Sequence, residues 1–76
     1  MDLGKVIKER RQAANLSLRE MAMRLGITTA ALWKIENNKS VPKLSTLKAV
    51  CKELGVPMAY LLNRSMTIED FMVSQQ

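Results

Sequence analysis

The 76-residue sequence is poor in the residues that build strands, disulfides and metal sites. It has one cysteine and no histidine, so it cannot form an internal disulfide and lacks the commonest metal ligand. Three glycines, two prolines and one each of Trp, Tyr and Phe give little support for strands or hairpin turns. No nucleophile has a general base to activate it, which argues against an enzyme. These absences favour one small all-α domain that needs neither a cofactor nor a metal ion.

Long apolar runs are missing as well. No run is long enough to cross a membrane, and the first residues lack the hydrophobic region of a signal peptide. We therefore expect a cytoplasmic protein without a membrane partner. Cys51 shares an apolar stripe with Leu47 and Leu54, which predicts a small buried hydrophobic residue rather than a reactive thiol.

Positive charge is in excess, and it is concentrated in the first 62 residues. The formal net charge is +5, and the pI is about 9.8. Residues 1–62 contain eleven Lys or Arg against five Asp or Glu, whereas residues 63–76 contain one Arg against two acids. A basic domain suits a polyanion, because neutralised phosphates release condensed counterions. A solvated basic surface that only aids solubility has the same composition, so charge alone does not decide between the two.

Apolar residues recur at helical spacing, and capping residues divide the pattern into five short helices. The first helix is expected at about residues 4–14, with Asn15 as a left-handed stop. Ser17 and Glu20 form a capping-box signature for the second helix, which Gly26 ends.

The remaining helices follow with short connections. The third is expected over about residues 28–37, with a threonine as its N-cap. The fourth should begin near Ser45 and Thr46 and end at Gly55, and Pro57 should open the fifth.

The second and third helices meet across the tight turn at Gly26, which is the layout of a helix-turn-helix. The third helix keeps Leu32 and Ile35 on one face. In this motif the second of the two helices enters the DNA major groove. Four residues point away from the apolar face and are available to such a ligand: Ala30, Trp33, Lys34 and Asn37.

From about residue 3 to residue 62 the chain resembles the Xre-type regulators, the five-helix DNA-binding domains of phage repressors and Cro proteins. The resemblance implies a compact five-helix lambda-repressor-like domain. The sequence departs from the family at Leu18, where many relatives have Gln, and at Asn38, where Gly is frequent. The matching elements, specific in their joint order and spacing, are Arg11, Leu16-Ser17, Glu20-Met21-Ala22, Leu25-Gly26-Ile27-Thr28, Leu32, Ile35-Glu36-Asn37, Pro42, Leu47 and Leu54-Gly55-Val56.

The resemblance also implies roles for particular residues. Arg11 and Glu36 match an ion pair that ties the first helix to the end of the recognition helix. Candidates for contact with base edges are Thr29, Ala30, Trp33 and Lys34. Candidates for contact with phosphates, some of them chosen because they flank the recognition helix, are Arg19, Thr28, Asn37, Asn38, Lys39 and Lys43.

Two of the base-contact candidates depart from the Gln and Arg common in relatives. Thr29 and Ala30 are small, so they can approach thymine methyl groups but carry little hydrogen-bond specificity. Trp33 lies about 100° around the helix from Leu32, which places its indole toward solvent or DNA. Partial packing of the indole against the loop after Asn37 is the alternative.

These features predict a sequence-specific transcriptional regulator, a repressor, that binds a palindromic operator in double-stranded DNA as a homodimer. The alternative is an antitoxin or adaptor module whose main partner is a protein, with autoregulatory DNA binding. Co-purification of a second polypeptide would distinguish the two hypotheses.

The sequence divides into a DNA-binding domain at residues 1–62 and a C-terminal tail at residues 63–76. Thr67 and Asp70 suggest a short tail helix, which is too short to be stable alone in water. The tail is therefore a candidate for dimerisation or for contact with another protein. The residues expected in that contact, some in the tail and some in the fifth helix, are Tyr60, Leu61, Ile68, Phe71 and Met72.

Overall fold

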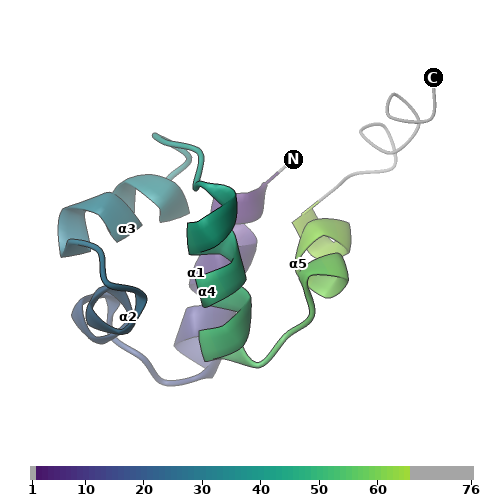
Figure 1. Ribbon diagram of the computed structural model, residues 1–76, viewed down its shortest axis with the longest axis horizontal. Coiled ribbons are helices and arrows are strands. Elements are labelled where there is room, and N and C mark those ends of the chain that lie inside the picture. Colours follow the sequence, from purple (N-terminus) through teal and green to yellow (C-terminus); the bar gives the residue numbers. More distant parts are fainter. Residues whose placement is uncertain (1, 66–76) are drawn as a thin grey trace.

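Five helices joined by short connections form the domain (Figure 1). The computed structural model describes residues 2–65, with side chains described as far as residue 63. No strand occurs within these residues, which confirms the all-α prediction. The predicted tail helix, with Ile68, Phe71 and Met72, lies outside the described residues. The helices are α1 (Leu3–Ala13), α2 (Leu18–Leu25), α3 (Thr29–Glu36), α4 (Leu44–Leu54) and α5 (Met58–Ser65).

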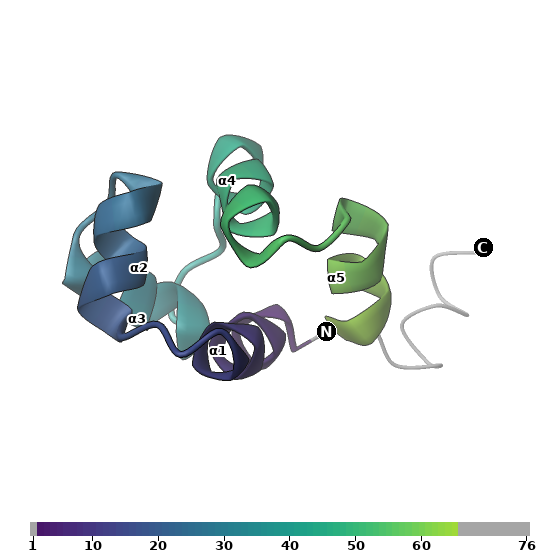
Figure 2. The same ribbon diagram turned by 90° about the horizontal axis from the view of Figure 1, so that it is seen from below.

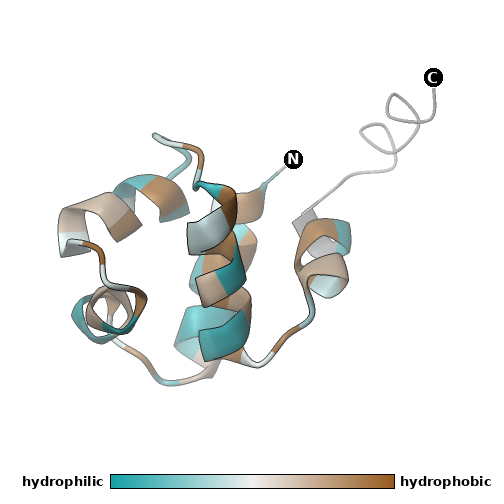
Figure 3. Ribbon diagram, viewed as in Figure 1, coloured by the Kyte–Doolittle hydropathy of each residue, from teal (hydrophilic) through white to brown (hydrophobic). Residues whose placement is uncertain are grey.

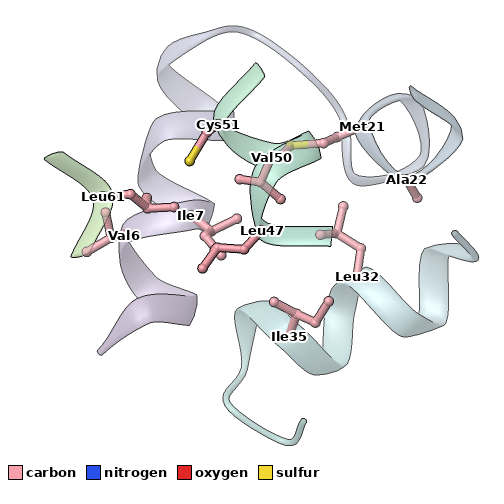
Figure 4. Close-up of a cluster of buried hydrophobic side chains, with 10 residues drawn as sticks. All are labelled: Val6, Ile7, Met21, Ala22, Leu32, Ile35, Leu47, Val50, Cys51 and Leu61. Atoms are coloured by element: carbon pink, nitrogen blue, oxygen red, sulfur yellow. The ribbon is translucent and has the colours of Figure 1, made fainter. Parts of the chain in front are cut away.

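The helices surround one apolar core. Figure 2 shows α1 and α4 on opposite sides of the domain, with α2 and α3 at one end and α5 at the other. Figure 3 shows hydrophilic and hydrophobic residues mixed along α4, as expected of a helix with one buried face. Each helix contributes one fully buried large side chain, and each such burial stabilises the fold by about 1.5–3 kcal/mol. These side chains are Ile7, Met21, Leu32, Val50 and Leu61 (Figure 4).

The ends of α2 form as the sequence predicts. Ser17 Oγ accepts a hydrogen bond from the Glu20 backbone N–H at 3.0 Å, and Glu20 Oε1 accepts from the Ser17 N–H at 3.3 Å. Gly26 ends α2 in the left-handed conformation, with φ of 73°. Asn15 is also left-handed, with φ of 58°. After Gly26 the chain enters α3, whose N-cap Thr28 accepts a hydrogen bond on its side-chain oxygen from the Ala31 N–H at 3.0 Å.

The C-terminal helix corrects one predicted contact. The expected subunit contact includes Leu61, but its side chain is fully buried in the core of its own domain. Tyr60 is half-buried, and its ring lies 5.8 Å from the guanidinium carbon of Arg10 on α1. The helix α5 continues to Ser65, three residues beyond the predicted domain boundary.

A buried ion pair ties α1 to the end of α3. Arg11 Nε lies 2.7 Å from Glu36 Oε2, and Arg11 Nη2 donates to Glu36 Oε1 at 3.0 Å. Arg11 Nη1 donates to the carbonyl oxygen of Leu16 at 2.8 Å. The guanidinium thus binds both carboxylate oxygens in a bidentate manner, which restricts the position of α3 relative to α1.

A second contact joins the start of α1 to the loop after α3. Asn38, in the left-handed conformation with φ of 57°, accepts a hydrogen bond on Oδ1 from the Gly4 N–H at 3.2 Å. Its Nδ2 donates to Asp2 Oδ1 at 3.0 Å. The helices approach so closely that a β-carbon on Gly4 would overlap the carbonyl oxygen of Ile35 and lie 2.6 Å from that of Glu36. Only glycine fits here without a backbone shift.

Replacing Glu36 with alanine is expected to destabilise the domain by about 3–5 kcal/mol, because Arg11 would remain buried and unpaired. The matched control is Glu53→Ala, which removes the acid of a pair with Arg24 at 3.8 Å. The side chain of Glu36 is 2% exposed and that of Glu53 is 29% exposed, so the control should cost at most about 1 kcal/mol. Urea denaturation at matched pH and salt measures both. Equal losses would show that the buried pair contributes no more than a surface pair.

Replacing Gly4 with alanine tests the close approach of α1 and α3. Helix propensity alone favours alanine over glycine by about 0.5–1 kcal/mol. We expect a loss of about 1–3 kcal/mol instead, because the added methyl group overlaps backbone oxygens. Lys8→Ala, at an exposed position of α1, should change stability by less than about 0.5 kcal/mol. A thermal unfolding temperature that rises for Gly4→Ala would contradict this packing.

Candidate nucleic-acid interface

The helix α3 has one buried and one exposed side. Leu32, Ile35 and Glu36 are buried, and they fix the inner side of the helix against the domain. The side chains on the outer side are exposed, as expected for a helix that presents its outer surface to a ligand. We call this surface the recognition face, and it consists of Thr29, Ala30, Trp33 and Lys34.

Trp33 dominates the recognition face by size. Its residue surface is 49% exposed, which places the indole on the outer side of α3 rather than in the core. The backbone carbonyl of Trp33 accepts hydrogen bonds from the Asn37 N–H at 3.0 Å and from Asn37 Nδ2 at 2.9 Å. The amide of Asn37 therefore folds back onto its own helix and completes the C-terminal end of α3.

Exposed basic side chains lie on the segments that precede and follow α3 along the chain. Arg19 is exposed near the start of α2, and Lys39 and Lys43 are exposed in the segment between α3 and α4. The backbone N–H of Lys39 donates to the carbonyl of Lys34 at 2.7 Å, which holds the start of that segment against the end of α3. The two lysines predicted to contact phosphates, Lys39 and Lys43, thus both lie in the segment between α3 and α4.

Residues 28–43 carry more basic than acidic side chains. Residues 28–43 contain three lysines and a single acid, Glu36. Because Glu36 is buried and bound by Arg11, its charge is neutralised inside the domain. The segment therefore presents exposed positive charge, which attracts a polyanion.

Three of the predicted phosphate candidates, Thr28, Asn37 and Asn38, have other roles in the structure. The hydroxyl oxygen of Thr28 caps α3, although its own proton remains available to a ligand. Asn38 uses its amide oxygen and nitrogen to bind Gly4 and Asp2, so it positions the loop. No local pattern in the sequence indicates the Asn38 contacts, because they join residues 34 and 36 positions apart.

The other chemistry of the described residues is sparse. Burial raises the pKa of the Cys51 thiol, which keeps it protonated and unreactive. Residues 2–63 include no cluster of three or more side chains suited to a metal ion. No helix among the described residues has the length and apolar character to span a membrane.

Comparison with known proteins identifies related sequences. A family model described as helix-turn-helix matches residues 7–61. The uncharacterized HTH-type transcriptional regulator RghRB of Bacillus subtilis (strain 168) is 35% identical over 69 residues. Those residues are 90% of this chain and 50% of RghRB. The chain thus spans about half the length of this curated relative.

Two solved structures share the fold and part of the sequence. SinR, a master regulator for biofilm formation solved in complex with DNA, is 33% identical with a TM-score of 0.73, over 79% of this chain and 97% of that chain. SinR in a complex with the SinI protein is 27% identical with a TM-score of 0.76, over 96% of this chain and 75% of that chain.

The all-helical fold with five helices in the described residues agrees with the sequence match and with the solved structures. The resemblance noted from the sequence is thereby confirmed. The chain belongs to the Xre-type helix-turn-helix family of DNA-binding transcriptional regulators, which are not enzymes.

Proposed function

We propose that this chain is a sequence-specific transcriptional regulator that inserts α3 into the major groove of double-stranded DNA. The observation that carries the proposal is the recognition face, exposed on a helix whose inner side is held by the core and by the Arg11–Glu36 pair. The relative SinR, solved in complex with DNA, supports the same ligand class.

The proposed contacts follow from the position of each side chain. The recognition face contacts base edges, and Lys34 donates to guanine acceptors or to a phosphate. Arg19 at the start of α2 and Lys39 and Lys43 after α3 contact phosphates on the two sides of the groove. Base contacts provide specificity, and phosphate contacts provide most of the affinity and its dependence on salt.

We also propose that two copies act together as a homodimer on a palindromic operator. One small domain buries too little surface to select a site in a genome, whereas two half-sites multiply the discrimination. Their recognition helices must then lie about 34 Å apart, one turn of DNA. A dimer seated on an operator blocks access to that DNA without further activity, so we propose repression.

A second candidate function is a module whose main partner is a protein, with autoregulatory DNA binding. The specific observation in its favour is that SinR has been solved in a complex with the SinI protein. In this chain the tail residues Ile68, Phe71 and Met72 fall at the spacing of one helix face and are the proposed contact.

We predict that binding to any DNA weakens steeply as salt rises, because several lysine and arginine contacts release counterions from phosphates. Lys39→Ala and Lys43→Ala should each lower the slope of log K against log salt by about 1 and weaken all sequences alike. Lys34→Ala should weaken binding and, where Lys34 contacts guanine, relax one base position by about 1–3 kcal/mol. Fluorescence anisotropy over a series of salt concentrations measures these effects.

Lys52→Ala is the matched control for the lysine variants. Lys52 is exposed in the last turn of α4, at the end of that helix farthest from the α3–α4 loop (Figure 1). An 11-residue helix spans about 16 Å, so the control should leave the slope unchanged. Association that is nearly independent of salt would overturn the DNA-binding proposal.

Deletion of residues 66–76 is predicted to convert a dimer into a monomer. The domain should remain folded, because every buried core residue among the described residues lies in α1–α5. Site-specific affinity should fall strongly, because a monomer contacts one half-site only. Analytical ultracentrifugation and circular dichroism measure assembly and folding.

Deletion of residues 74–76 is the control, because it keeps Ile68, Phe71 and Met72 and should leave the dimer intact. An unchanged dimer after the longer deletion would place the subunit interface elsewhere. The tail would then be free for a different protein, as the second candidate function requires.

A further inference from the structure

The recognition face has little capacity for hydrogen bonds to bases. Residues 28–34 contain no Arg, Asn, Gln, Asp or Glu, and the polar side-chain groups of the recognition face are the hydroxyl of Thr29, the indole N–H of Trp33 and the ammonium of Lys34. Ala30 has no polar side-chain atom, and the indole of Trp33 offers a single N–H donor. Lys34 is the only charged residue in this set.

The neighbouring amides do not make up for this lack. Asn37 Nδ2 donates to the carbonyl of Trp33 at 2.9 Å, which turns the amide toward its own backbone. Asn38 Oδ1 accepts from Gly4, and its Nδ2 donates to Asp2. These amides therefore stabilise the end of α3 and the following loop, where they are not positioned as a bidentate pair for adenine.

What the recognition face offers instead is apolar surface. Trp33 is 49% exposed and lies one helical turn from the exposed methyl group of Ala30. The apolar group that a base pair presents in the major groove is the C5-methyl group of thymine. On the basis of the proposed function, we propose that Trp33 and Ala30 recognise thymine methyl groups, so that each half-site carries thymines at the base pairs they contact.

The test begins with a site selected from random double-stranded DNA by the full chain. Each thymine of the half-site is then replaced singly by deoxyuridine, which removes the C5-methyl group and keeps base pairing. Binding should weaken about fourfold at each contacted thymine, the fold-change that corresponds to about 0.8 kcal/mol for one buried methyl group. The DNA control is deoxyuridine placed outside the half-sites, which should have no effect.

Protein variants assign the methyl contact to residues. In Trp33→Ala the preference for thymine over deoxyuridine should disappear at one or more positions, and in Ala30→Gly it should shrink at its own position. Leu44→Ala is the control, because Leu44 is a large exposed apolar residue on α4, outside the recognition face. It should keep the full preference. Thermal unfolding checks that each variant is folded. If a variant does not fold, the deoxyuridine series with the unaltered chain still tests the methyl contact.

The outcomes separate this inference from the proposed function. Specific, salt-sensitive binding with equal affinity for thymine and deoxyuridine everywhere would overturn the methyl contact and leave the proposed function standing. A thymine preference that persists unchanged in both Trp33→Ala and Ala30→Gly would overturn the assignment to these residues. Absence of sequence-dependent DNA binding would overturn both proposals together.

Discussion

Arg11 joins its own helix α1 to two other segments of the chain, and the position of α3 depends on it. Its guanidinium donates to both carboxylate oxygens of Glu36 and to the carbonyl of Leu16. A charge buried without a partner costs several kcal/mol, so both side chains must stay paired whenever the domain is folded. Because the guanidinium and carboxylate are planar and bind in a bidentate manner, few arrangements of α1 and α3 satisfy them. The pair therefore acts as a geometric restraint on the recognition helix.

Other contacts restrain both ends of α3. Gly26 turns the chain in a left-handed conformation, and Thr28 caps the first turn of α3. Near the C-terminal end, the amide of Asn38 binds the start of α1 where Gly4 allows close approach. A recognition helix must be placed to within a fraction of an ångström for its side chains to reach base edges. Restraints at both ends of α3 meet this demand in a domain with a small core.

Local signals in the sequence predicted much of this fold. The capping box of Ser17 and Glu20 and the left-handed stops at Asn15 and Gly26 depend on residues a few positions apart, so pattern alone locates them. Arg11 and Glu36 are 25 residues apart, and their pairing was implied only by family resemblance. Helical periodicity predicted the exposure of Ala30, Trp33 and Lys34, because these residues lie opposite the buried stripe, whereas Thr29 was added by the family resemblance.

Contacts between distant segments account for what the sequence did not show. The role of Asn38 depends on Gly4 lying beside the end of α3, and no local pattern reports that approach. Leu61 lies on the inward face of α5 and is fully buried. A subunit contact needs exposed apolar side chains, and Leu61 is not one of them. A short amphipathic helix has one buried face, which the core of its own domain occupies first.

Fold and recognition use different residues of the same helix. Leu32, Ile35 and Glu36 hold α3 in place from its buried side, whereas the exposed side carries the contacts proposed for DNA. Substitutions on the exposed side can therefore change the preferred base sequence at little cost in stability, since they remove no buried contact. Glu36 links the two sides electrostatically. Because its carboxylate is buried against Arg11, the one negative charge in residues 28–43 is paired inside the domain, and the exposed charges of this segment are its three lysines.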